Sequence, residues 1–252
     1  MTVQILLSTY NGAAYLKPLL DSVLQQDYPD LKILIRDDGS SDDTVKILQS
    51  YAATYDRIQV ILGENLGFVQ SFLQLVTLAS ATTDYFAFCD QDDVWLPDKI
   101  SRSVQAVRSY SQATPILYGS RATIVDAVLN PLGYIQIPVK QLSFQNALVE
   151  CSLIGCTSLF NQATRQLLLR QLPQFAYSHD WWVYLVAAAF GEVVYDRESR
   201  ILYRQHDKNL FGAITMEAEQ TQNLTSAFAL RINQWRRRID RFITEGPQRR
   251  VV

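Results

Sequence analysis

Short apolar runs alternate along the first half of the chain with segments whose apolar residues recur every three or four positions. The runs predict five buried strands, at 3–8, 31–36, 57–62, 85–89 and 115–118. The segments between them predict helices, whose inward-facing residues are Leu16, Leu19, Leu20, Val23 and Leu24, then Thr44, Ile47, Leu48 and Tyr51, then Phe68, Phe72, Leu75 and Val76. Apolar strands that alternate with helices predict an α/β fold, in which a mainly parallel sheet is covered by helices on both faces.

Residues that end or begin helices separate these elements. Pro29 breaks the first helical segment, and Ser40 or Ser41, followed by two aspartates, is a helix N-terminus signal. Gly67 opens the third helix, and Pro97 suits the first turn of the next helix.

The pattern loosens beyond residue 120. Turn residues at Asn130, Gly133 and Pro138 indicate a meandering segment. Residues 152–160 have the pattern of a strand, and residues 180–190 that of a helix. The sequence contains no clean linker, internal repeat or low-complexity tract.

Polar signatures follow three of the predicted strands, at 8–11, 37–38 and 90–93. In parallel sheets ligands bind beyond the carboxyl ends of the strands. These three segments are therefore the candidates for a binding site.

The acidic segment at 90–93 has the clearest chemistry. Asp90, Asp92 and Asp93 follow an apolar strand, where like charges raise one another's pKa unless a cation intervenes. Carboxylates suit Mg²⁺ or Mn²⁺, and such a cation neutralises a departing diphosphate as a Lewis acid. The alternative is a solvated loop, or a charge cluster at the start of the next helix. The position after a buried strand favours the metal site.

The other two segments fit either a nucleotide site or ordinary turns. Asp37 and Asp38 can accept from a base N–H or a ribose hydroxyl, but with Gly39 and Ser40 they also make a usual turn and helix cap. By itself this segment favours the cap. The hydroxyls and amides at 8–12 can face a nucleotide or form a turn. Neither a dinucleotide-binding glycine motif nor a P-loop is present, which argues against those two enzyme classes.

Two further clusters lie late in the sequence. Asp180, at a helix start beside Trp181 and Trp182, fits a general base with aromatic rings for a sugar, or a capping residue with core tryptophans. Arg204 fits a phosphate contact, and His206 fits either a metal ligand or a structural hydrogen-bonding group.

Composition narrows the class of protein. The 252 residues are 48% hydrophobic with a formal net charge of −2, which indicates a globular chain and no nucleic-acid partner. The three cysteines contain no Cys-x-x-Cys pair, so we expect reduced, buried thiols and no structural zinc. The longest apolar run, 181–190, is too short to span a bilayer. The N-terminus enters a strand-like run at once, so we expect no signal peptide. We therefore expect a cytoplasmic protein that can lie against the inner face of the membrane.

Residues 1–210 resemble the inverting family 2 glycosyltransferases of the GT-A fold. The resemblance rests on the order and spacing of four motifs, Ser8-Thr9-Tyr10-Asn11-Gly12, Asp37-Asp38-Gly39-Ser40, Asn65-Leu66-Gly67 and Asp90-Gln91-Asp92-Asp93. Bacterial rhamnosyltransferases, which use dTDP-L-rhamnose to build cell-surface polysaccharides, are the most similar, judged by Asp90 to Trp95, His179 to Trp182 and Tyr203 to His206. The resemblance implies a GT-A, Rossmann-like catalytic domain at 1–210, with a nucleotide-sugar half at 1–120 and an acceptor half at 121–210.

The resemblance also implies a role for each site residue. It implies nucleotide contacts from Thr9, Tyr10, Asn11, Asp38 and Asp90, metal ligation by Asp92 and His206, catalysis by Asp180 as the base, and substrate contacts from Asp93, Trp181 and Arg204. The implied partners are a nucleotide-diphospho-sugar donor, Mg²⁺ or Mn²⁺, and a glycan or lipid-linked acceptor. The Gln-x-x-Arg-Trp motif of processive members is absent, so we expect one sugar to be added per encounter.

Three other functions remain as alternatives. A UDP-sugar-dependent family 2 enzyme that transfers a glucosyl, galactosyl or N-acetylhexosaminyl group fits the same motifs. A sugar-phosphate nucleotidyltransferase fits less well, because segment 8–12 has neither a glycine cluster nor an arginine. A non-catalytic nucleotide-sugar-binding module is disfavoured because Asp92 and Asp180 are both present.

The last segment, 211–252, predicts a basic amphipathic helix. Its apolar stripe contains Phe228, Ile232, Trp235, Ile239 and Phe242, surrounded by arginines. Such a helix can dock on the catalytic domain, pair with a second copy in a dimer, or lie on an anionic membrane.

Overall fold

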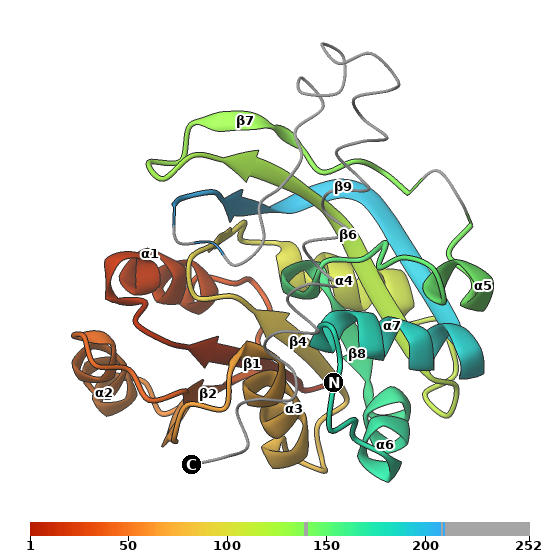
Figure 1. The fold of residues 1–252 in the computed structure, drawn as a ribbon, viewed down its shortest axis with the longest axis horizontal. Coiled ribbons are helices and arrows are strands. Elements are labelled where there is room, and N and C mark those ends of the chain that lie inside the picture. The colour runs from red at the N-terminus through yellow and green to blue at the C-terminus, as the bar shows by residue number, and fades with distance from the viewer. Residues whose placement is uncertain (139–140, 208, 210–252) are drawn as a thin grey trace.

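The computed structural model describes residues 1–138, 141–207 and 209, and these residues build one mixed sheet. Its strand order is β3-β2-β1-β4-β8-β6-β9-β5, with β7 paired to β6 (Figure 1). The strands are β1 (Val3–Thr9), β2 (Leu31–Asp37), β3 (Ile58–Leu62), β4 (Tyr85–Cys89), β5 (Val94–Trp95), β6 (Ile116–Val125), β7 (Pro131–Tyr134), β8 (Leu159–Asn161) and β9 (Glu192–Arg204). The helices are α1 (Ala13–Leu24), α2 (Thr44–Thr54), α3 (Phe68–Leu78), α4 (Lys99–Val107), α5 (Phe144–Ala147), α6 (Gln162–Arg170) and α7 (His179–Phe190), with a 3₁₀ turn η1 (Gly155–Thr157).

Strands β1 to β4 form the parallel part of the sheet, and their side chains supply two cores. Ile5 and Leu7 point to one face, whereas Leu6 between them points to the other. Phe86 and Phe88 of β4 share the second face with Leu6. Because both faces are buried, each strand is apolar along its whole length, which explains why the runs were recognisable in the sequence.

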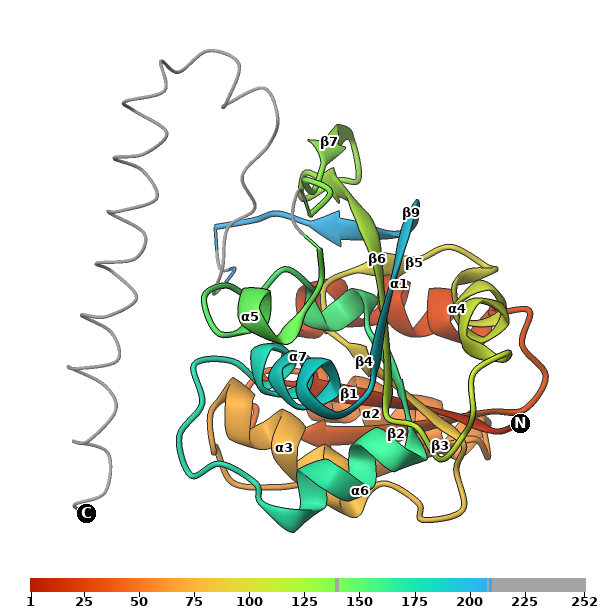
Figure 2. The same cartoon turned by 90° about the vertical axis from the view of Figure 1, so that its right-hand side faces the viewer.

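Helices cover both faces of the sheet (Figure 2). The first face packs against α1, α2 and α4, through residues such as Leu19, Leu48 and Ile100. The second face packs against α3, α6 and α7, through residues such as Phe72, Leu168 and Tyr184. The predicted α/β architecture, a mainly parallel sheet between two helical layers, is confirmed.

The second half of the chain completes the sheet with a different topology. Strand β8 runs antiparallel to both β4 and β6, and β9 runs parallel to β6. The short strand β5 from the first half pairs antiparallel with the end of β9. These pairings bring the segment after residue 200 back to the acidic loop that follows β4.

Several boundaries differ from the prediction. The predicted strand at 152–160 forms only at its end, as β8, because Gly155–Thr157 turns into a 3₁₀ helix. The fifth strand, predicted at 115–118, continues to Val125 as β6. Pro97 lies before helix α4, whose N-cap is Asp98, instead of in its first turn.

The predicted C-terminal amphipathic helix at 211–252 lies outside the described residues. Among the helices that are described, none has the length and apolarity that crossing a bilayer requires.

Candidate active site

The carboxyl ends of β1, β2 and β4 lie side by side. Thr9 is in register with Asp37 at the ends of β1 and β2, and Leu7 is in register with Cys89 at the end of β4. The three polar segments of the sequence therefore meet at one edge of the sheet, as parallel pairing requires.

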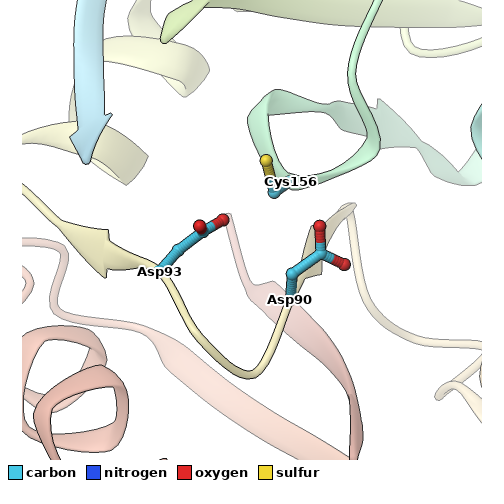
Figure 3. Close-up of side chains that lie close together, drawn as sticks. All are labelled: Asp90, Asp93 and Cys156. Carbon is cyan, nitrogen blue, oxygen red and sulfur yellow. The ribbon is translucent and has the colours of Figure 1, made fainter. Parts of the chain in front are cut away.

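The acidic loop after β4 packs against the 3₁₀ turn. The ligating atoms of Asp90, Asp93 and Cys156 all lie within 4.8 Å of one another (Figure 3). Burial, together with the charges of Asp92 and Asp180, raises the pKa of the Asp90 carboxyl to about 7. The ionised form of Asp90 is therefore disfavoured unless a cation balances its charge.

Asp93 is the most buried member of the loop. Its side chain is inaccessible to solvent, and burial raises its pKa well above the usual range. One carboxyl oxygen accepts a hydrogen bond from the backbone N–H of Arg204 at 3.1 Å. Asp93 thus links the acidic loop to the end of β9.

Asp92 points instead to the segment after β9. Its Oδ2 lies 2.9 Å from Nε2 of His206, and Nδ2 of Asn209 donates to the same oxygen at 3.2 Å. The guanidinium Nε of Arg204 donates to the backbone oxygen of Asp92 at 2.6 Å. A carboxylate oxygen and an imidazole nitrogen are both ligands that Mn²⁺ or Mg²⁺ accepts, and here they lie side by side, so the residues present fit such a cation.

Asp180 lies at the N-terminus of α7, where Ser178 caps the helix by accepting from the backbone N–H of Trp181. The Oδ2 atom of Asp180 accepts from the backbone N–H of Gly155 at 2.9 Å, and Oδ1 accepts from Trp181 N–H at 2.8 Å. Gly155 begins the turn that carries Cys156, so this turn contacts both Asp180 and the acidic loop. The structure therefore brings the candidate base close to Asp90.

The loop after β1 is held by hydrogen bonds from two neighbouring loops. The hydroxyl of Thr9 donates to Asp37 at 2.9 Å, and the side-chain oxygen of Asn11 accepts from the backbone N–H of Ser41 at 2.8 Å. Gln91 forms two hydrogen bonds with the backbone of Tyr10. Tyr10 remains 48% exposed, so it is open to a ligand.

Asp38 is bound mainly within the protein. Only 2% of its surface is exposed, and its carboxylate accepts from the guanidinium of Arg36 and from the backbone N–H groups of Leu66 and Gly67. This arrangement fixes the Asn65-Leu66-Gly67 loop to the end of β2, which explains why the two motifs occur together.

The remaining site residues also have protein partners. The indole N–H of Trp181 donates to the backbone oxygen of Ala147 at 2.6 Å, which joins α7 to α5. The Arg204 guanidinium is 4% exposed and donates to the backbone oxygen of Ala127 at 2.6 Å. Its Nη2 is buried and has no hydrogen-bond partner among the described residues.

The sequence model of the family described as "Glycosyl transferase family 2" matches residues 4–163, a stretch that extends from β1 to β8 and includes the acidic loop. The chain belongs to this family. It is therefore a glycosyltransferase, and the resemblance drawn from its motifs is confirmed.

Two relatives of this family 2 glycosyltransferase cover most of its length. The dTDP-rhamnosyl transferase RfbG of Shigella flexneri is 29% identical over 224 residues, which are 82% of this chain and 74% of that protein. An uncharacterized glycosyltransferase of Rickettsia typhi is 26% identical over 242 residues, covering 92% of this chain and 73% of that protein.

Solved structures share the fold. S. aureus TarS in complex with UDP-GlcNAc superposes with a TM-score of 0.66 at 16% identity, covering 83% of this chain and 60% of that chain. A mannosyltransferase of Pyrobaculum calidifontis in complex with GDP-Man and Mn²⁺ gives a TM-score of 0.59 at 18% identity, covering 82% of this chain and 58% of that chain. This glycosyltransferase thus spans about 60% of the TarS chain.

Four residues of the site were not predicted. Tyr15, Gln91 and Asn209 each contact a predicted site residue, and Cys156 lies beside Asp90 and Asp93. Gln91 stands inside the acidic motif, so its position was a usable signal. Tyr15, Asn209 and Cys156 carried no such signal, because the residues they contact are distant in the sequence.

Proposed function

We propose that this family 2 enzyme transfers a single sugar, L-rhamnose from dTDP-L-rhamnose, with inversion onto a hydroxyl of a glycan or lipid-linked acceptor. The observation that carries the proposal is the 2.9 Å contact between Oδ2 of Asp92 and Nε2 of His206. The acidic loop that contains Asp92 also packs against the 3₁₀ turn, and this turn donates a hydrogen bond to Asp180. A diphosphate site and a base on one edge of the sheet are what a direct displacement needs.

The choice of donor is supported by similarity. The relative from Shigella flexneri, which this chain matches over 82% of its length, bears the name dTDP-rhamnosyl transferase. The exposed ring of Tyr10 would lie against the base, and the loops held by Asp38 and Asn11 would surround the nucleoside. Asp90 would accept from the ribose.

The reaction is a single displacement. Asp180 accepts the proton of the acceptor hydroxyl as that oxygen attacks the anomeric carbon of the donor. The bond between that carbon and the diphosphate oxygen breaks on the opposite face, so the configuration inverts. Two hydrogen bonds from backbone N–H groups, of Gly155 and Trp181, orient the Asp180 carboxylate for this task.

Asp92 and His206 would hold a divalent cation, Mn²⁺ or Mg²⁺. Bound there, the cation would offset the negative charge of the departing diphosphate. Arg204 keeps Asp92 in place through its backbone oxygen, and Trp181 borders the acceptor side. The acceptor would be presented at the inner face of the membrane, where the enzyme acts as a cytoplasmic protein.

The test is donor hydrolysis with Mn²⁺ across a panel of dTDP-, UDP- and GDP-sugars. We expect nucleotide diphosphate to be released from dTDP-L-rhamnose, and this activity to be lost in Asp92→Ala but retained in Asp56→Ala, which removes an exposed carboxylate elsewhere. A preference for a UDP-sugar would replace the rhamnose assignment. Turnover that needs neither a cation nor Asp92 would refute the metal site.

A further inference from the structure

Tyr15 lies in the first turn of α1, at the side of the candidate cation site. Its ring stacks on the imidazole of His206, with centroids 4.6 Å apart and an interplanar angle of 19°. The guanidinium carbon of Arg204 lies 4.7 Å from the centre of the same ring. Tyr15 therefore contacts two of the three side chains that approach Asp92, namely Arg204 at the end of β9 and His206 beyond it.

The three contacts of Asp92 come from the end of β9 and the residues that follow it. Arg204 ends β9, and His206 and Asn209 follow it outside any helix or strand. Asn209 accepts from the backbone N–H of His206 and so fixes its main chain. The backbone hydrogen bond acts on the main chain of His206, whereas the stack on Tyr15 acts on the plane of the imidazole ring.

We propose that Tyr15 is a positioning residue for the cation site, and that its ring holds the His206 imidazole in the orientation that directs Nε2 at Asp92. A stacked aromatic pair restricts the imidazole to one plane. The flanking Arg204 guanidinium adds a cation–π contact to the same ring. The proposal rests on the proposed function, because it assumes that Asp92 and His206 bind a divalent cation.

The hydroxyl of Tyr15 does not take part in this role. Within the part of the chain that the structure describes, it forms no hydrogen bond, so only the ring is needed. Tyr15→Phe should therefore retain the function, whereas Tyr15→Leu keeps an apolar side chain but removes the aromatic face. Comparison of Tyr15→Phe with Tyr15→Leu therefore shows whether an aromatic ring is needed to orient His206 or whether any apolar side chain that fills the space is enough.

The measurement is Mn²⁺ binding to the full chain without donor, by titration calorimetry or Mn²⁺ electron paramagnetic resonance. Partners that orient a metal ligand are worth about 10–100-fold in affinity. We expect Tyr15→Leu and Tyr15→Ala to weaken binding about 10-fold, and Tyr15→Phe to stay within about twofold of the wild type. Tyr51→Ala, which truncates a tyrosine of α2, is the control and should bind Mn²⁺ as the wild type does.

A double-mutant cycle shows whether the effect passes through His206. Once His206→Ala has removed the imidazole, the further change Tyr15→Leu should cost nothing more. A loss of equal size in both backgrounds, or wild-type affinity in Tyr15→Leu, would overturn the proposal. Binding that ignores Asp92→Ala and His206→Ala would instead overturn the cation site itself, and with it the role of Tyr15.

Proton NMR provides a readout independent of the cation. The chain has only two histidines, so the ring resonances of His206 are identified by their loss in His206→Ala. The stack on Tyr15 should shift them upfield, and Tyr15→Leu should move them downfield while Tyr15→Phe leaves them in place. Unchanged resonances in Tyr15→Leu would contradict the stack.

Discussion

The backbone N–H of Gly155 donates to Oδ2 of Asp180 at 2.9 Å, and the space beside this bond is closed to a larger residue. A Cβ atom at Gly155 would lie 2.8 Å from Nε2 of His179 and 3.4 Å from the Cβ of Asp180. The turn can therefore approach the candidate base only because residue 155 has no side chain.

Gly155→Ala should displace Asp180 and leave the donor site intact. Misplacing a catalytic group by about 1 Å costs on the order of 100-fold in rate. We expect transfer to fall by about this factor with donor affinity unchanged, as measured by steady-state kinetics and by donor titration. Wild-type transfer in a folded Gly155→Ala variant would show that the approach is not needed.

Asp180→Asn should remove the base but keep the shape of the site. General-base catalysis contributes roughly 10²–10⁴-fold, so transfer to the acceptor should decrease by that factor. Donor binding should persist, because Asp180 is expected to contact only the acceptor. Asp56→Asn, an exposed change of the same chemistry, is the matched control. Equal activity in both variants would exclude Asp180 as the base.

His179 should make the folded state sensitive to acid. Its ring stacks on Phe72 at 3.9 Å and meets the edge of Phe88, and burial lowers its pKa from 6.5 to about 4. Between these pH values the unfolded chain binds a proton at this residue that the folded chain does not, so the contribution of His179 to stability decreases as the pH falls from 6.5 to 4. Across this pH range, His179 lowers the free energy of unfolding by about 3 kcal/mol.

Urea unfolding at a series of pH values measures this dependence. His179→Leu should remove the loss of stability that this residue causes between pH 6.5 and 4, and so shift the slope of the curve in that range relative to the wild type. Replacement of His206, the only other histidine, serves as the control and should leave that part of the slope in place. A slope retained in His179→Leu would assign the acid sensitivity to other groups.

Asp93 should act as a neutral hydrogen-bond acceptor. Burial raises the pKa of its carboxyl well above the usual range and so favours the neutral form, for which asparagine is a close replacement. We expect Asp93→Asn to change the free energy of unfolding by less than about 1 kcal/mol. Asp93→Ala should cost about 1–3 kcal/mol, since it leaves the Arg204 N–H buried without an acceptor. Equal losses in a thermal or urea unfolding assay would contradict this reasoning.

The sequence predicted the parallel half of the fold because those strands are buried on both faces. Strand β9 was missed because only part of it is buried, its residues at 196–200 are mainly polar, and its pairing with β6 shifts register near Arg121. A partly exposed strand with an irregular register has neither a continuous apolar run nor a clean alternation. The prediction at 152–160 failed for a related reason, since the 3₁₀ turn Gly155–Thr157 interrupts a run that is apolar on both sides.

The polar segments of the candidate site could be predicted from the sequence, because each of them directly follows a predicted strand. The relationships across the site could not, because they join residues far apart in the chain: Asp92 lies 114 residues from His206, and Gly155 lies 25 residues from Asp180. Cys156 was expected to be a reduced, buried thiol, and its position beside the acidic loop depends on how β8 inserts between β4 and β6. No local pattern reports such an insertion.

The pairing of β5 with β9 limits how members of this family can be recombined. Val94 and Trp95 belong to the half of the chain that we propose binds the donor, but they pair with Leu202 and Ile201 of the half proposed for the acceptor. The salt bridge between Arg200 and Asp98 adds a side-chain link between the same two halves. A chimera that joins the two halves of different parents near residue 120 would therefore pair β5 of one parent with β9 of the other. Exchange of acceptor preference by domain shuffling should succeed only when residues 94–102 and β9 come from the same parent.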